Sequence, residues 1–250
     1  MRVAKERSVS FYIPTQISQQ MKSYLKNIIV LASLAVMATS ANADSLTLST
    51  NNSYSVLPGG AFIAKINNGP ISNADYSGVA KIGSDSFLTF CIEYNEHFSS
   101  PGTYNYALNT GAVNGGVSGQ TSPNFDPISN GTAFLYSKFA QGSLAGVAGF
   151  TYGKTSTGYG YLQNAIWFLE GEITTGNALS SYVINNVANY NAASNGAAGV
   201  FALNLTDAAG GVHQDQLYYR NVPDQGATVA LLGLGLLCMV GLRRRFVSAK

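Results

Sequence analysis

The side chains with the most chemical potential in this chain are those of its two cysteines, Cys91 and Cys238. Cys238 lies in an apolar segment close to the C-terminus, so Cys91 is the single cysteine of the region before it. A leftover cysteine in an exported protein pairs with another chain, stays buried as a small apolar residue, or takes part in other chemistry. The sequence around Cys91 leaves these three fates open.

A second segment supplies a possible partner for Cys91. In Gln163-Asn164-Ala165-Ile166-Trp167, helical spacing places Gln163, Ile166 and Trp167 on one flank of a helix. Trp167 is the only tryptophan in the chain. Its indole, one turn from Gln163, would cover the carboxamide and keep water away from it.

These two segments together resemble the thioester domains of bacterial surface adhesins. Those domains combine an aromatic-Cys-aliphatic strand motif, here Phe90-Cys91-Ile92-Glu93, with a later Gln-x-Ala-Ile-Trp helix motif. The resemblance covers roughly residues 60–205. It implies an internal thioester between the thiol of Cys91 and the side chain of Gln163. The residues that would shape and shield this bond are Glu93, Ala165, Ile166 and Trp167.

The implied chemistry is a single acyl transfer. A fold that holds the Cys91 sulfur against the Gln163 carbonyl supplies a high effective molarity, ammonia leaves, and a thioester remains. An amine or hydroxyl of a partner then takes the acyl group, and Cys91 departs as a thiolate. The protein would act as an adhesin without turnover, so we expect no enzyme and no cofactor.

Other readings of the same residues are weaker. His97 or His213 could activate Cys91 in a hydrolase, but no peptidase signature surrounds the cysteine. Glu170 and Glu172 could be paired carboxylates, although a solvated helix end is the simpler interpretation. One cysteine and two scattered histidines predict no metal site. Trp167 and the fifteen tyrosines could form a sugar-binding face, so the alternative function is a non-covalent polysaccharide- or matrix-binding structural protein.

The last thirty residues have the order of a sorting signal. Val222-Pro223-Asp224-Gln225-Gly226 precedes an apolar run of sixteen residues, 227–242, and a basic cluster. A membrane span needs roughly 20 residues, so this run would form a short anchor. The tail resembles the PEP-CTERM group in its Val-Pro-Asp-x-Gly variant, which implies recognition by an exosortase in the inner membrane of a Gram-negative bacterium. The residues that carry this resemblance are Val222, Pro223, Asp224, Gly226, Arg243, Arg244 and Arg245.

The N-terminal region has the features of a secretory signal peptide. Met21 is followed by Lys22 and Lys26, an apolar core at 28–38, and the small-residue pattern 41–43. Residues 1–43 are therefore assigned to export, with Met21 as the expected start. The sorting signal takes residues 221–250, and one domain occupies residues 44–220. We expect export, a transient membrane anchor, and then a place on the cell surface or in the extracellular matrix.

The charge of the exported domain differs from that of the whole chain. The chain carries a net charge of +2, yet residues 44–220 contain five basic and ten acidic residues, a net charge of −5. An acidic domain without a basic stripe argues against binding to nucleic acid or to anionic lipid. The partners that remain are matrix polysaccharide or a surface amine or hydroxyl.

The hydrophobic pattern predicts a mainly β fold. Strands are expected at 45–50, 60–66, 86–94, 200–206 and 214–219, with alternation placing Leu88, Phe90, Ile92 and Tyr94 on the apolar face. Residues 99–129 read as loops, because prolines and glycines are frequent there. Helices are expected at 132–141, 161–170 and 179–190. We therefore predict an antiparallel β-sandwich or barrel with an α-helical insertion, an α+β fold.

Overall fold

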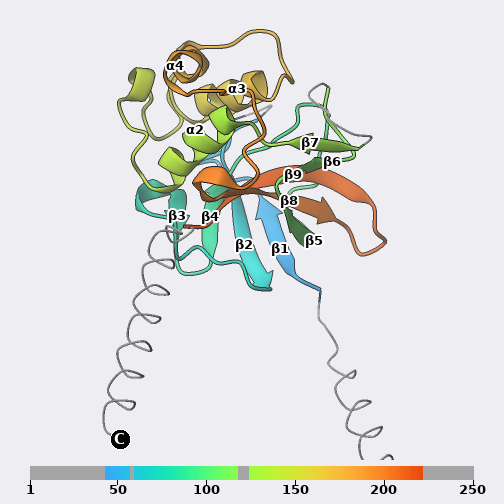
Figure 1. Cartoon of the computed structure of the whole chain (residues 1–250). Coiled ribbons are helices and arrows are strands. Elements are labelled where there is room, and N and C mark those ends of the chain that lie inside the picture. The colour runs from blue at the N-terminus through green and yellow to red at the C-terminus, as the bar shows by residue number, and fades with distance from the viewer. Residues whose placement is uncertain (1–42, 57–58, 118–123, 222–250) are drawn as a thin grey trace, which may run out of the picture. The chain divides into compact units, whose positions relative to one another are not determined.

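The strands of this protein form one large antiparallel sheet and one small one (Figure 1). The computed structural model describes residues 43–56, 59–117 and 124–221. The strands of these residues are β1 (Ser45–Ser49), β2 (Phe62–Asn68), β3 (Lys81–Ile82), β4 (Ser86–Thr89), β5 (Gly102–Asn109), β6 (Gly111–Val113), β7 (Phe125–Pro127), β8 (Val200–Thr206) and β9 (Val212–Tyr219). The α-helices are α2 (Asn130–Ala140), α3 (Tyr159–Leu169) and α4 (Ala178–Asn186).

The seven-stranded sheet has the order β3-β4-β2-β1-β5-β8-β9, and β6 pairs with β7 separately. Each pairing is antiparallel. Alternation along β1 buries Leu46 and Leu48 completely and leaves the residues between them half-buried. One face of the central strands therefore points into the core.

The chain beyond β4, near one end of the large sheet, meets β9 at the other end. After β4, the chain continues beside β9. There the Leu217 amide donates to the Phe90 carbonyl at 3.0 Å, and the Ile92 amide donates to the backbone carbonyl of Asp215 at 3.1 Å. Between these bonds Cys91 forms an antiparallel bridge with Gln216. The sheet thus curls into a barrel whose closing segment contains Cys91.

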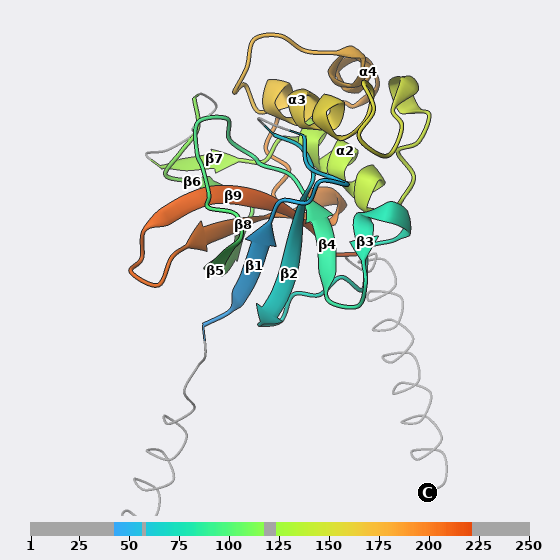
Figure 2. The same ribbon diagram turned by 180° about the vertical axis from the view of Figure 1, so that it is seen from behind.

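The helices gather at one end of the strands, as both views show (Figures 1 and 2). Helix α2 packs against β8 and β9, and α3 and α4 contact α2. Ser129 caps α2 by accepting a hydrogen bond from the Thr132 amide, and Asn177 begins α4 with a capping box. These caps satisfy backbone amides that the first turn of each helix leaves open.

Two tyrosines connect α2 to the place where the chain after β4 meets β9. The hydroxyls of Tyr76 and Tyr136 lie 2.9 Å apart, and both side chains are buried. The Tyr136 hydroxyl also lies within hydrogen-bond distance of the carbonyls of Leu88 in β4 and Leu217 in β9, at 3.1 and 2.9 Å. The side chain of Tyr136 therefore joins the two strands that the closure brings together.

The predicted mainly β fold with a helical insertion is confirmed. The first two helices and the two C-terminal strands lie where the sequence placed them, and α4 is shorter than expected. The loop predicted at 99–129 was wrong, since it contains β5, β6 and β7. The predicted strand 86–94 was too long, because β4 ends at Thr89, and Tyr94 is 46% exposed rather than on the apolar face. Strands β5, β6 and β7 were not predicted because many of their residues are small or polar.

The predicted signal peptide and sorting tail fall on residues 1–42 and 222–250, which lie outside the described residues. Within the described part of the chain, no helix is long and apolar enough to cross a membrane.

The variant Tyr136→Phe tests the contribution of the closure to stability. Removal of the hydroxyl leaves buried carbonyls at Leu88 and Leu217 with one partner fewer, so the free energy of unfolding should fall by about 1–3 kcal/mol. Urea denaturation measures this change. The control is Tyr182→Phe, because the Tyr182 ring stacks on Phe134 in a partly exposed position and the variant keeps that ring. Equal losses in both variants would contradict the role of the Tyr136 hydroxyl.

Candidate functional site

The carboxamide of Gln163 pairs with the backbone of Cys91. The backbone groups of Phe90 and Ile92, on either side of Cys91, form hydrogen bonds with β9. In an antiparallel pair, the amide and carbonyl of Cys91 therefore point to the opposite edge. There the Cys91 amide donates to Gln163 Oε1 at 3.0 Å, and Gln163 Nε2 donates to the Cys91 carbonyl at 2.8 Å. Gln163 thus occupies the place that another strand would take, and it satisfies two buried backbone groups.

Both members of this pair are shielded from water. Gln163 is 0% exposed and Cys91 is 1% exposed. Gln216 Nε2 donates to the Cys91 sulfur at 3.6 Å. Burial raises the pKa of the Cys91 thiol to about 12, although the contact with Gln216 opposes this shift. The thiol is therefore protonated at neutral pH, unlike the activated cysteine of a hydrolase.

Trp167 covers the segment that follows Cys91. Its Nε1 donates to the Glu93 carbonyl at 3.1 Å, and its ring meets the ring of Tyr94 edge to face at 4.9 Å. Gln214 also donates to the Glu93 carbonyl. The predicted motif residues Ala165 and Ile166 are buried on the same helix, α3. Because Trp167 is itself buried, it does not contribute to an exposed sugar-binding face.

Gly59 lies directly against Gln163 and Trp167. A Cβ atom at this position would stand 2.4 Å from Cη2 of Trp167 and 2.6 Å from Cγ of Gln163. These distances are shorter than real Cβ contacts, so only glycine fits without displacing the two side chains. Gly59 also lines a cavity of ≈ 280 Å³, with Gly160, Tyr161 and Asn164 of α3 in its wall.

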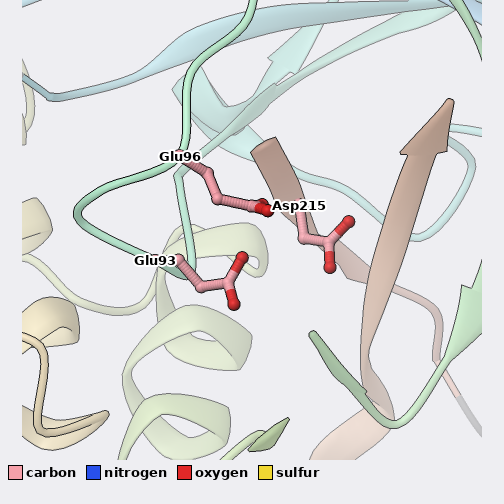
Figure 3. Close-up of side chains that lie close together, drawn as sticks. All are labelled: Glu93, Glu96 and Asp215. Carbon is pink, nitrogen blue, oxygen red and sulfur yellow. The ribbon is translucent and has the colours of Figure 1, made fainter. Parts of the chain in front are cut away.

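Three carboxylates gather beside the closure (Figure 3). Glu93 and Glu96 extend from the chain after β4, Asp215 extends from β9, and one oxygen of each lies within 4.8 Å of the others. A β-bulge sets the position of Asp215, because the register between β8 and β9 shifts between Leu203 and Leu205. Burial raises the pKa of Glu93 to about 10 and that of Asp215 to about 8.

The interpretation of Glu170 and Glu172 as a solvated helix end was wrong. Their exposed fractions are 5% and 4%. Glu170 accepts hydrogen bonds from the amide and hydroxyl of Ser129, while Glu172 accepts from the amides of Tyr94 and Val117. The two carboxylates therefore hold loops in place, since each binds backbone groups distant in the sequence.

The histidines do not form a dyad with Cys91 in the part of the chain that the structure describes. His213 is half-buried in β9, and its ring pairs with Asp207 at 3.3 Å. His97 is exposed, and its carbonyl accepts from the Gln214 amide. Among the described residues, the side chain that donates a hydrogen bond to the Cys91 sulfur is that of Gln216, not of a histidine.

The sequence interpretation missed four residues around this site: Gly59, Glu96, Asp215 and Gln216. A weak signal existed for two of them, because Asp215 and Gln216 are polar residues inside a predicted strand, directly before its apolar end at 217–219. Gly59 and Glu96 gave none, since their importance comes from chain segments that only the fold brings close.

A comparison with protein families identifies the C-terminal tail. A family model of the VPDSG-CTERM motif matches residues 221–246. The chain is thus an exported protein with an exosortase-type sorting tail, which indicates processing by such an enzyme and attachment at the surface. Neither the curated proteins nor the solved structures contained a match to the chain.

The variant Gly59→Ala tests the packing over Gln163. The added methyl group must displace Trp167 or Gln163, so the fluorescence of Trp167, the only tryptophan, should shift to longer wavelength as its indole meets water. The control is Gly160→Ala, whose Cβ would meet only Val56, at 3.1 Å. A spectrum of Gly59→Ala identical to that of the wild type would contradict this packing.

The raised pKa of Asp126 predicts that the stability of the fold depends on pH. Burial, with smaller contributions from Glu170 and Glu172, raises the pKa of Asp126 from 3.8 to about 7. The folded state therefore holds a proton that the unfolded state releases, and this source of stability is lost as the pH rises from 3.8 to about 7. The unfolding free energy of wild type should fall over this window relative to Asp126→Asn, which does not titrate. Parallel urea-derived stability curves for the two proteins would contradict this pKa shift.

Proposed function

We propose that this exported protein attaches covalently to a partner surface through an internal thioester between Cys91 and Gln163. The observation that carries the proposal is the pair of hydrogen bonds, at 3.0 and 2.8 Å, between the Gln163 carboxamide and the backbone of Cys91. They hold the acyl carbon beside the residue whose thiol would attack it. Such placement turns an inert amide and a thiol into reactants of high effective concentration.

The same two hydrogen bonds support bond formation. When the Cys91 sulfur adds to Cδ of Gln163, negative charge develops on Oε1, which already faces the Cys91 amide. This amide acts as an oxyanion-type donor. Nε2 leaves as ammonia after it takes the thiol proton, and the Cys91 carbonyl that it faces orients its departure. One S–C bond forms, one C–N bond breaks, and the atoms balance.

The surroundings of the pair favour survival of the thioester. Water hydrolyses such a bond, and the burial of Cys91 and Gln163 excludes water. Trp167 and Gly59 close the site from one side. An incoming amine would attack Cδ of Gln163, form an amide, and return its proton to the sulfur, so each molecule reacts once and does not act as an enzyme.

The sorting tail supports a role at the surface. The VPDSG-CTERM motif directs the chain outward, where amines and hydroxyls of matrix polysaccharide or neighbouring surfaces are available. The net charge of residues 44–220, −5, fits a neutral or basic partner better than an anionic one.

The native mass of the protein, isolated as the cell processes it, tests the thioester. We expect a mass lower than the sequence mass of the processed chain by one ammonia, and an adduct at Gln163 after treatment with methylamine. Cys91→Ala and Gln163→Ala should each restore the full mass and abolish the adduct. Gln141→Ala is the matched control, because Gln141 is an exposed glutamine at the end of α2 that should leave the mass deficit unchanged.

The opposite result is equally clear. A full native mass, together with a folded protein that gives no methylamine adduct, would exclude the thioester. The alternative would then be a non-covalent polysaccharide- or matrix-binding structural protein.

A further inference from the structure

We propose that Glu93, Glu96 and Asp215 form a binding site for a calcium ion. Their nearest oxygens lie within 4.8 Å of one another. Calcium binds carboxylate oxygens at about 2.3–2.6 Å, so two ligands on opposite sides of one ion stand about 4.6–5.2 Å apart. The three carboxylates are therefore already within the distances that a single ion requires.

The second observation is the buried carboxylate of Glu93. Its side chain is 0% exposed, and neither of its oxygens has a hydrogen-bond partner among the described residues. Its carboxylate extends toward Asp215 (Figure 3). A buried carboxylate without a partner is costly to ionise, and a cation in this position would supply the missing interaction.

Asp215 is prepared as a ligand rather than left unpaired. Its Oδ2 accepts from the Val113 amide and from Asn204 Nδ2, both at 2.7 Å, and its Oδ1 accepts from the Leu205 amide at 3.1 Å. These bonds fix the direction of the carboxylate, as outer-shell contacts do in metal sites, and Oδ1, which accepts only one hydrogen bond, keeps a lone pair for an ion.

Among the described residues, no basic side chain forms an ion pair with the three acids. The ion pairs between described residues are Lys65–Asp85 and His213–Asp207, and neither includes a member of the cluster. Because three carboxylates in one place repel one another, a divalent cation stabilises the folded arrangement more than any neutral group.

The donor set selects the type of metal. All three ligands are carboxylates, which suit calcium, magnesium or manganese rather than zinc. Calcium accepts irregular geometry and several ligand numbers, whereas magnesium requires a near-ideal octahedron. Glu96 is half-buried, so water can complete the coordination from its side. Export also favours calcium, since extracellular modules bind it with dissociation constants of about 10⁻⁴–10⁻³ M.

The ion would fasten the closing segment of the barrel. Glu93 and Glu96 follow Cys91 on the segment after β4, and Asp215 precedes Gln216, the bridge partner of Cys91. An ion held by all three acids therefore links the two chain segments that meet at the closure. This site does not depend on the thioester, so Cys91→Ala should bind calcium like the wild type.

Terbium luminescence tests the site in the protein as the cell processes it. Tb³⁺ replaces Ca²⁺, and Trp167 lies close enough to sensitise it, because its Nε1 donates to the Glu93 carbonyl at 3.1 Å. We expect Tb³⁺ emission on tryptophan excitation, displaced by added Ca²⁺. Glu93→Gln and Glu96→Gln should each weaken binding by at least about tenfold, since even outer-shell changes cost 10–100-fold.

The control variant is Asp85→Asn, which removes an exposed carboxylate that pairs with Lys65, away from the cluster. It should keep the wild-type emission and calcium competition. Glu96→Gln changes a half-buried residue and keeps the test valid if Glu93→Gln folds poorly. Absence of sensitised emission in the wild type, or full emission in folded Glu96→Gln, would overturn the proposal.

Discussion

The closure of the barrel depends on a buried segment of three residues, 90–92. The backbone amides and carbonyls of this segment need hydrogen-bond partners on both of its edges. On one edge, Phe90 and Ile92 bond to β9. On the other, no strand is available, and the carboxamide of Gln163 accepts from and donates to Cys91. Buried amides and carbonyls without partners are strongly disfavoured, so the position of α3 and the closure of the sheet are mutually dependent.

This constraint also explains why a polar side chain is buried in the middle of α3. Gln163 lies in a helix whose other inward residues are apolar, and on packing grounds alone leucine would fit such a face. Its carboxamide carries both a donor and an acceptor, so one side chain of a neighbouring helix completes the hydrogen bonds of the Cys91 backbone. The proposed thioester adds a chemical use to a structural pairing. Both uses need the same contact between Gln163 and Cys91. The native mass distinguishes them, because only the thioester lowers it by one ammonia.

The sequence predicted the parts of the fold that carry strong periodicity. Helices α2 and α3 and strands β8 and β9 have regular apolar residues, and each lies close to its expected position. Strands β5, β6 and β7 were missed because glycine, proline and asparagine dominate their surroundings and pairing with distant strands decides their conformation. The pairing of Cys91 with Gln163 was predicted as a bond between side chains through a family resemblance, whereas the structure shows hydrogen bonds from the Gln163 carboxamide to the Cys91 backbone.

The acidic cluster was beyond sequence reasoning for a related reason. Glu93 and Glu96 look like ordinary polar residues, and Asp215 becomes their neighbour only through the closure and the bulge in β9. The same closure therefore brings together the backbone of Cys91, the carboxamide of Gln163 and the three carboxylates. The proposed bond requires the closure and α3, and the proposed ion site requires the closure, so neither can exist in the unfolded chain. Folding is then the step that creates both, and the effective concentration of Cys91 and Gln163 is a property of the folded state alone.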